Sequence, residues 1–431
     1  MYTKKRNLKK GLNEVYTIYK GRQVSLLKPI NSSSRSFHGA LKWILITAQC
    51  FGQIPVIGIT KPDVKLFKFK WKSWRTFYCI LNCTGAFFLT STYVINVFVN
   101  GMDIFSSTSV AFHINTLAVT LLFLKLATQW PKLMYKWAEM EQSMKRYGWP
   151  PYLHIRLNVL TLIVLSIALV EYTIVKTNKF LISKKYKTNE SIFEYYITIT
   201  LYPHIFPYTK YAHWKGVILQ IMNILLTFSW TFNDLFIMLI STGLAVRFQE
   251  ITVRLRTLKS LKSTTIETWR EIREDYNRLS QLTKTVDNAL SYIILASFTN
   301  NLFFILAQLF NSLRPMKDTL EKVYFFFSFG FMIIRTVSVS IYGAWIYDES
   351  KEPTTILNSI LSDTYNVEIK RFINQIKFDT VALSGKHFFY IRRGLILSMA
   401  GAIVTYELVL IQFNVNLLQE ETSENGTITY S

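Results

Sequence analysis

"TYELVLIQF", at Thr405–Phe413, lies inside the last hydrophobic segment of the chain, Gly394–Leu418. The segment is long enough to cross a bilayer, because a transmembrane helix needs about 20 mostly apolar residues. It also carries Glu407 and Gln412, and a carboxylate at the bilayer centre costs roughly 2.5 to 3.5 kcal/mol on insertion scales. We therefore expect a polar environment on one face of this helix.

Six more runs of similar length precede this segment, in a chain of 431 residues that is 50% hydrophobic. Such a composition is too apolar for a soluble domain, and we predict an all-α polytopic membrane protein with seven transmembrane helices. The expected spans are Arg75–Val99, Ser109–Thr128, Leu157–Val175, Gly216–Val246, Ala289–Ser312, Val323–Tyr347 and Gly394–Leu418. A further stretch, residues 37–60, is interrupted by Lys42, Gln49, Gln53 and Pro55 and predicts a re-entrant or interfacial segment.

The distribution of basic residues predicts that the N-terminus is intracellular. With that orientation, 36 of the 49 Lys and Arg residues fall in cytosolic loops and 10 in outer loops, as the positive-inside rule requires. Because these Lys and Arg residues are distributed over several loops and not gathered in one patch, they do not indicate a nucleic-acid partner. The expected parts are a basic cytosolic N-terminus (1–36), the interfacial segment (37–60), spans one to six (61–347) with a helical stalk around 247–288, a cytosolic anchor helix (348–393), span seven (394–418) and an extracellular tail (419–431).

Two acceptor sequons fall on the outer side of this topology, at Asn189 and Asn425, and predict glycosylation there. Three cysteines all lie in apolar runs, so they indicate no disulfide framework. Neither a metal-binding HExxH pattern nor a nucleophile elbow or phosphate loop is present. We expect no metal, no cofactor and no enzymatic activity; membrane lipid is an obligatory partner.

Polar residues within the spans recur at helical spacing. Trp230 and Asp234 lie one turn apart in the fourth span, while Asn300 and Gln308, with Asn301 beside the former, share a face in the fifth. Aromatic faces beside amides and carboxylates suit a polyhydroxylated ligand. Alternatively, these groups only form hydrogen bonds to one another between helices, each worth ~0.6 kcal/mol.

Three further residues leave alternatives open. Asp234 either binds ligand or neutralises Arg335 of the sixth span as a buried pair. Glu171, at the outer end of the third span, is either a ligand contact or simply hydrated.

The last span also carries a stripe at offsets of four, three and four residues: Ala402, Tyr406, Val409 and Phe413, with Gln412 adjacent. Spacing alone favours ordinary helix packing for this stripe. If several identical subunits placed the stripe around a common axis, it would instead form a hydrophobic constriction. Before this span, residues 364–382 form an amphipathic pattern, and Gly385 predicts a break between two helices.

The terminal motif, preceded by "ALSGKHFFYIRRG" and by "YDESKEPTTIL" at the end of the sixth span, resembles the insect gustatory receptors. The likeness extends to the sugar-receptor branch through "CFGQIPVIGI", "ALVEY", "FSWTFNDLFIMLIS" and "SFTNNLFFILAQLFNSL". One departure is Tyr172, where sugar-receptor relatives often carry His after Glu171.

The resemblance implies a sugar-gated nonselective cation channel in the plasma membrane of taste neurons, at their dendrites. It also implies a homotetramer, or a heterotetramer with related receptors, around a pore lined by the last helix. Val409, Gln412 and Phe413 would then lie at the gate. The ligand contacts would be Glu171, Trp230, Asp234, Asn300, Asn301 and Gln308, in the outer half of spans two to six.

Two other classes compete with this hypothesis. A seven-span receptor coupled to a G protein needs an outer N-terminus, which would place the 36 basic residues on the wrong side. A transporter would show flux without macroscopic current, and the chain has no internal repeat of the kind that marks many transporter folds.

Overall fold

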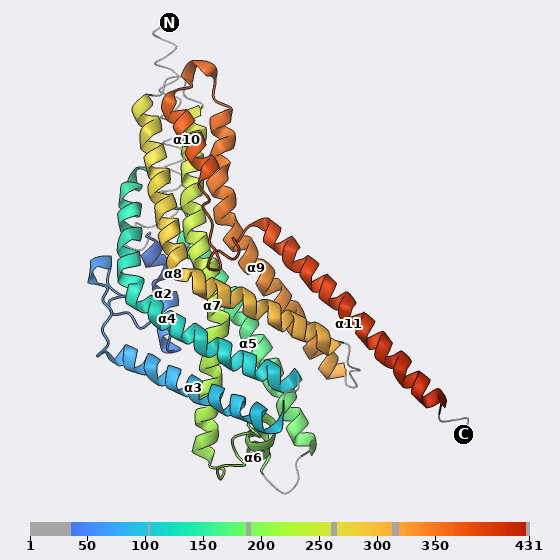
Figure 1. The fold of residues 1–431 in the computed structure, drawn as a ribbon. Helices are drawn as coiled ribbons and strands as arrows, with labels where there is room; N and C mark the ends of the chain where they lie inside the picture. The colour runs from blue at the N-terminus through green and yellow to red at the C-terminus, as the bar shows by residue number, and fades with distance from the viewer. Residues whose placement is uncertain (1–35, 102–103, 187–190, 260–264, 313–318, 428–431) are drawn as a thin grey trace.

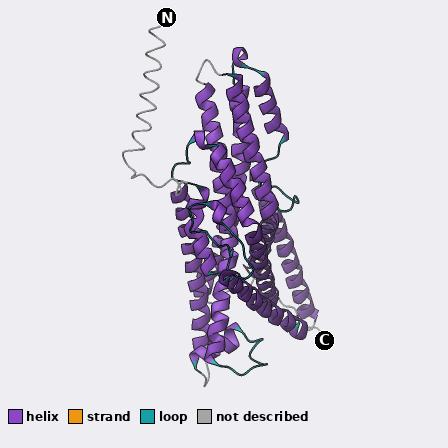
Figure 2. Cartoon of the chain, turned by 90° about the vertical axis from the view of Figure 1, so that its left-hand side faces the viewer, coloured by secondary structure: helices purple, strands orange, loops and turns teal. Residues whose placement is uncertain are grey.

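The computed structural model describes residues 36–101, 104–186, 191–259, 265–312 and 319–427, and nearly all of them are helical (Figure 1). The helices are α2 (Phe37–Cys50), α3 (Trp74–Asn100), α4 (Ile104–Ser143), α5 (Leu153–Tyr186), α6 (Ile192–Tyr195), α7 (His213–Lys259), α8 (Ile266–Ser312), α9 (Thr319–Asn358), α10 (Val367–Phe378) and α11 (Arg393–Thr427). Within these ranges β-structure is limited to two isolated bridges. Figure 2 shows the long helices running side by side as one elongated bundle.

Six helices in the described part of the chain are long and apolar enough to cross a membrane. They are α3, α4, α5, α7, α8 and α9. The expected count of seven is therefore not matched by these described helices. α11 is nevertheless a continuous helix of 35 residues.

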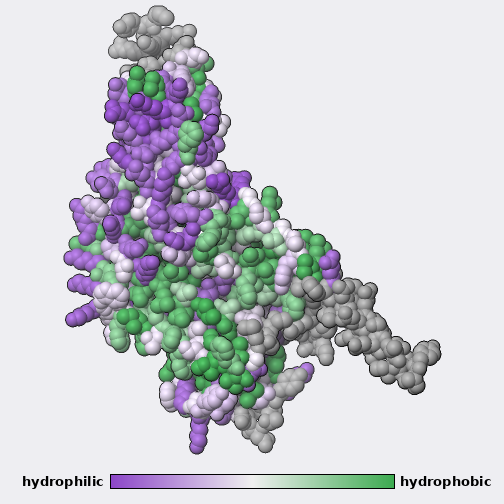
Figure 3. All heavy atoms as spheres, viewed as in Figure 1, coloured by the Kyte–Doolittle hydropathy of each residue, from purple (hydrophilic) through white to green (hydrophobic). Residues whose placement is uncertain are grey.

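The two longest helices, α7 and α8, contain 47 residues each and join the apolar and polar parts of the bundle. Each extends well beyond the roughly 20 residues that a bilayer requires, so residues 247–259 and 266–288 are continuations of these helices. Figure 3 shows hydrophilic side chains around the end where α7, α8 and α10 meet, and hydrophobic ones gathered over the middle of the face in view. Side chains of α7 from Thr231 to Phe248 are buried without interruption, which makes α7 the central helix.

The segment after Ser36 forms a short helix that is packed into the main core. Phe37 stacks on Trp137 of α4 at 3.9 Å between ring centroids, and its backbone N–H donates to Glu141. Gly243 of α7 allows this approach, since a Cβ there would lie 2.3 Å from the Phe37 ring. With only 14 residues, α2 is too short to span a bilayer.

The connection from α10 to α11 differs from the simple break expected at Gly385. Residues 383–391 fold back as a narrow turn, in which the amide of Ile391 donates to the carbonyl of Leu383 at 2.8 Å. Both the backbone N–H and the hydroxyl of Ser384 donate to Asp287 of α8, at 2.6 and 2.9 Å. The Asp287 carboxylate therefore holds the turn against α8. The expectation of a break at Gly385 did not include this contact.

Candidate functional site

The polar residues of the fourth, fifth and sixth spans meet in the middle of the bundle. α7 supplies Trp230 and Asp234, α8 supplies Asn301, and α9 supplies Arg335. Asp234 is completely buried, and 5% of Arg335 is exposed. Two opposite charges at this depth persist only when they neutralise each other and their remaining hydrogen-bonding groups are satisfied.

Asp234 is the centre of this cluster. Its Oδ2 lies 2.8 Å from Nε of Arg335 and accepts a hydrogen bond from Nδ2 of Asn301 at 3.1 Å. The hydroxyl of Ser297 donates to Oδ1, and Asn301 in turn accepts from Nη2 of Arg335 at 3.1 Å. Asp234 and Arg335 therefore form a buried ion pair, which is one of the two alternatives that the sequence left open.

Aromatic rings cover one side of the ion pair. The guanidinium of Arg335 lies 4.7 Å from the centroid of the Trp230 ring, within cation–π range. Trp230 also contacts Phe304 of α8 at 4.9 Å and Phe112 of α4 at 5.4 Å. Asn300 lies one turn before Phe304 on the same helix, so its side chain projects from the same face of α8.

Several polar atoms around the cluster lack a hydrogen-bond partner among the described residues. They are Nε1 of Trp230, Nδ2 of Asn300, Oδ1 of Asn233 and Nε of Arg335, whose contact with Asp234 is an ion pair rather than a hydrogen bond. A buried donor or acceptor left in this state costs about 1 to 3 kcal/mol, and native structures contain few of them. Both oxygens of Asp234 are thus engaged, whereas the rim of the cluster offers two donors, on Trp230 and Asn300, and one acceptor, on Asn233.

The other two predicted ligand contacts lie further from Asp234. Glu171 of α5 accepts a hydrogen bond from Ser328 of α9 at 2.8 Å and interacts electrostatically with Arg335. Glu171 is therefore not merely hydrated. Gln308 is half-buried on α8, one turn beyond Phe304 toward the end at Ser312. Asp234, Asn301, Trp230 and Glu171 are linked through Arg335, and the structure shows no such link for Gln308.

The predicted gate residues lie on the last helix, which Figure 1 shows leaving the bundle at an angle. Val409 is 40% exposed and Gln412 is also exposed, while the side chain of Phe413 lies outside the described ones. Of the two sequons, Asn189 lies outside the described residues, as does the side chain of Asn425. Across the described ranges, no group of three or more His, Cys, Asp or Glu residues is arranged to hold a metal ion.

Sequence reasoning missed three side chains that the structure brings to the site. Ser297 precedes Asn301 by four residues, so helical spacing could have identified it. Ser328 and Phe112 come from other helices, and nothing in the sequence connects them to Glu171 or Trp230. The two described cavities lie elsewhere, one between α4 and α8 and one between α7 and α9.

The fold is that of the insect olfactory receptors. Superposition on olfactory receptor OR5 from Machilis hrabei gives a TM-score of 0.65, covering 86% of this chain and 98% of that receptor at 13% sequence identity. Its complex with eugenol gives a TM-score of 0.62. At this level of identity the likeness establishes the shared architecture.

The sequence defines the family within that fold. Residues 20–422 match the model of the trehalose receptor family. Gustatory receptor for sugar taste 64f of Drosophila melanogaster is 34% identical over 89% of this chain and 82% of its own length. Gustatory receptor 5a for trehalose, from the same organism, is 32% identical over 95% of this chain and 91% of its own. The chain belongs to the trehalose receptor family and is a multi-pass membrane chemoreceptor, which confirms the resemblance drawn from its motifs.

Proposed function

We propose that this receptor is a sugar-gated, nonselective cation channel that serves as a sweet-taste receptor. The observation that carries this proposal is the rim of unpaired polar atoms on Trp230, Asn300 and Asn233, beside aromatic rings. Sugar hydroxyls supply both donors and acceptors, and the C–H faces of a sugar ring pack on aromatic side chains. A relative that is named for trehalose supports a saccharide as the ligand.

The proposed ligand contacts fall into two groups. Trp230 and Asn300 would touch the sugar directly, together with Gln308 toward the outer end of α8. Asp234, Asn301 and Glu171 would hold Arg335 and thereby fix the Trp230 ring. This division follows from the bonds already made, because the oxygens of Asp234 are occupied by Ser297, Asn301 and Arg335.

The last helix would line the pore of a tetramer. α11 exposes apolar side chains on a single chain, among them Leu397 at 76% and Leu408 at 58%. Large exposed apolar surfaces on a helix are covered by lipid or by another subunit. Four copies of α11 around one axis would bring Val409, Gln412 and Phe413 together, where apolar rings close a pore by excluding water. Homotetramers and heterotetramers with related receptors both satisfy this geometry.

Sugar would open the pore by favouring one arrangement of the helices over another. A ligand shifts such an equilibrium only by its differential affinity for the two states. α8 and α9 carry the ligand cluster, and both also contact α11 through residues near its start, including Leu395 and Met399, which pack on the main core. Displacement of α8 against α9 at the Asn301–Arg335 hydrogen bond would therefore be transmitted to the pore helix.

The proposed location is the plasma membrane, at the dendrites of taste neurons. An intracellular N-terminus would place Asn189 and Asn425 outside, where both would be glycosylated. Glycosidase digestion of receptor from a cell surface tests this topology. Modification at Asn31 with Asn189 bare would contradict it.

Recording sugar-evoked currents from oocytes that express the full chain tests the ligand site and the mechanism together. Asn300→Ala removes one hydrogen bond worth about 0.5 to 1.5 kcal/mol, so the half-maximal sugar concentration should rise roughly 2- to 10-fold. Asn358→Ala, at the exposed end of α9, is the matched control and should leave the dose response unchanged. Currents should persist in excised patches without GTP. A requirement for GTP would refute the channel, and an unchanged Asn300→Ala response would refute the site.

A further inference from the structure

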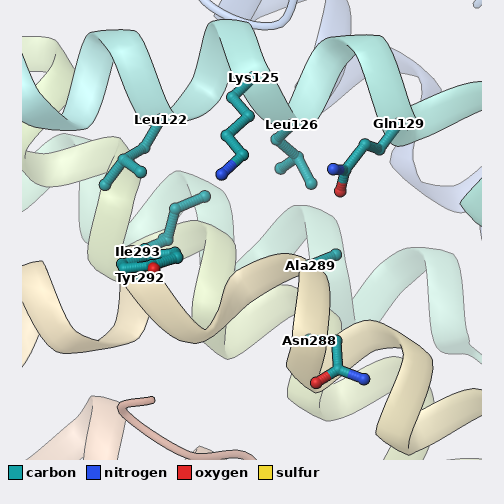
Figure 4. Close-up of a pocket in the computed structure, with 8 residues that line it drawn as sticks. All are labelled: Leu122, Lys125, Leu126, Gln129, Asn288, Ala289, Tyr292 and Ile293. Carbon is teal, nitrogen blue, oxygen red and sulfur yellow. The ribbon is translucent and has the colours of Figure 1, made fainter.

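A groove between α4 and α8 lies apart from the sugar site. It encloses about 60 Å³, and Figure 4 shows Lys125 of α4 extending across it toward Tyr292 of α8. Its lining residues are Leu122, Lys125, Leu126, Gln129, Asn288, Ala289, Tyr292 and Ile293. The groove thus combines one cation, a phenol and two amides with an apolar wall.

A second cation approaches the same ring from another part of the chain. Nζ of Lys125 lies 5.2 Å from the Tyr292 ring centroid, and Nζ of Lys386 lies 4.5 Å from it. In the described part of the chain, neither lysine takes part in an ion pair within 4.0 Å. The carboxylate near Lys386 is Asp287, and both of its oxygens already accept hydrogen bonds from Ser384. Two ammonium groups therefore lie near one ring without an ion pair within 4.0 Å in the described residues, although Asp287 interacts electrostatically with Lys386.

The level of the groove in the membrane follows from the chain topology. Gln129 follows the expected second span within α4, Asn288 ends the expected cytosolic stalk of α8, and Lys386 belongs to the segment between α10 and α11. These positions place the groove at the inner boundary of the bilayer. Lys125 and Tyr292 are both exposed on the single chain at this level, beside the apolar side chains of Leu122 and Ile293.

We propose that the groove between α4 and α8 binds the phosphorylated headgroup of an anionic lipid from the inner leaflet. Lys125 and Lys386 would neutralise the phosphate charge, and the Tyr292 hydroxyl and the amides of Gln129 and Asn288 would donate to its oxygens. Basic pockets between membrane helices on the cytoplasmic side are suited to such headgroups. The acyl chains would lie against the partly exposed Leu122 and Ala289, an apolar contact that a water-soluble phosphate does not need.

Binding would also influence the turn that leads into the last helix. Lys386 belongs to the turn that Ser384 fastens to Asp287, and α11 begins seven residues later, at Arg393. A headgroup held jointly by Lys125 and Lys386 would tie this turn to α4 as well as to α8. That consequence for gating rests on the proposed channel function, whereas lipid binding itself does not.

Native mass spectrometry of the purified full-length receptor in detergent tests the proposal with two lipids, phosphatidylinositol 4,5-bisphosphate and phosphatidylcholine. Because a lysine at a membrane surface contributes about 1 kcal/mol to binding an anionic lipid, Lys125→Gln and Lys386→Gln should each weaken binding of the bisphosphate roughly fivefold, and the double variant roughly 25-fold. Lys125→Arg should keep the affinity. Lys370→Gln, which removes an exposed cation from α10, is the charge-matched control.

Three outcomes would overturn the proposal. The double variant could bind the bisphosphate as tightly as the native receptor, or Lys370→Gln could weaken binding as much as either groove variant. Soluble inositol 1,4,5-trisphosphate could displace the lipid with equal affinity, which would show that no acyl chain is recognised. Since none of these measurements uses sugar or current, their failure is distinct from failure of the channel proposal.

Discussion

Neutralisation of Asp234 is the perturbation that examines the centre of the site most directly. Asp234→Asn keeps the shape, but its single amide oxygen can accept from only one of Ser297 and Asn301, and Arg335 becomes a buried charge without its partner. Breaking a buried pair in this way costs about 3 to 5 kcal/mol. Arg335→Met leaves the opposite charge unpaired and should cost a similar amount.

The double variant Asp234→Asn/Arg335→Met distinguishes an ion pair from two independent contributions. Both charges are then absent, and replacing a buried pair by uncharged groups of similar volume is often neutral or stabilising. We expect the double variant to recover most of the loss, giving a coupling energy of several kcal/mol. Arg256→Met is the control, because its ion pair with Glu352 is exposed and worth about 0 to 1 kcal/mol.

The assay is thermal inactivation of solubilised receptor, followed by fluorescence-detected size-exclusion chromatography for each single and the double variant. Surface labelling of the same variants separates misfolding from loss of sugar response. A double variant as unstable as the two single variants combined would refute the buried-pair reasoning. If both single variants and the double variant were as stable as the native receptor, the buried-pair reasoning would also be refuted.

Two further predictions concern packing away from the ligand. Gly243→Ala should destabilise the receptor by about 1 to 3 kcal/mol, because the new methyl group would meet the Phe37 ring. The methyl group of Gly330→Ala would meet nothing within 4 Å, so this control variant should be neutral or stabilising by about 0.5 to 1 kcal/mol. Thermal inactivation of the two variants measures the difference in stability. Equal stability of both variants would contradict the close contact between Gly243 and Phe37. Asp287→Asn should loosen the turn at Ser384 by weakening two hydrogen bonds to a charged acceptor, each worth about 1.5 to 3 kcal/mol. Faster hydrogen exchange at residues 383–391 would confirm this, and unchanged exchange would exclude it.

Hydrophobic run length predicted most of the helices correctly. The expected span Arg75–Val99 corresponds to α3 at Trp74–Asn100, since runs this apolar have no alternative to a helix in lipid. Helical spacing also pointed to Trp230, Asp234 and Asn301, which the structure brings together with Arg335, because residues four apart share a face. Spacing within one helix does not say which faces of different helices meet. Ser328 and Phe112 could therefore not be assigned to the site.

The seventh span shows where sequence and structure contribute differently. The motif at Thr405–Phe413 identified the family, and the family model confirms it. The structure adds that α11 leaves the bundle with apolar side chains uncovered, so that its partner comes from outside this chain or from lipid.

The sequence by itself determined the class, the helical spans and the family, because each depends on local composition and motif. Only the tertiary structure decided that Asp234 is neutralised by Arg335, that Lys125 and Lys386 share one ring, and that Ser384 fastens the last turn to α8. These pairs are separated by roughly 100 to 260 residues in sequence. Their contact energies arise from the packing of whole helices, which no local pattern encodes.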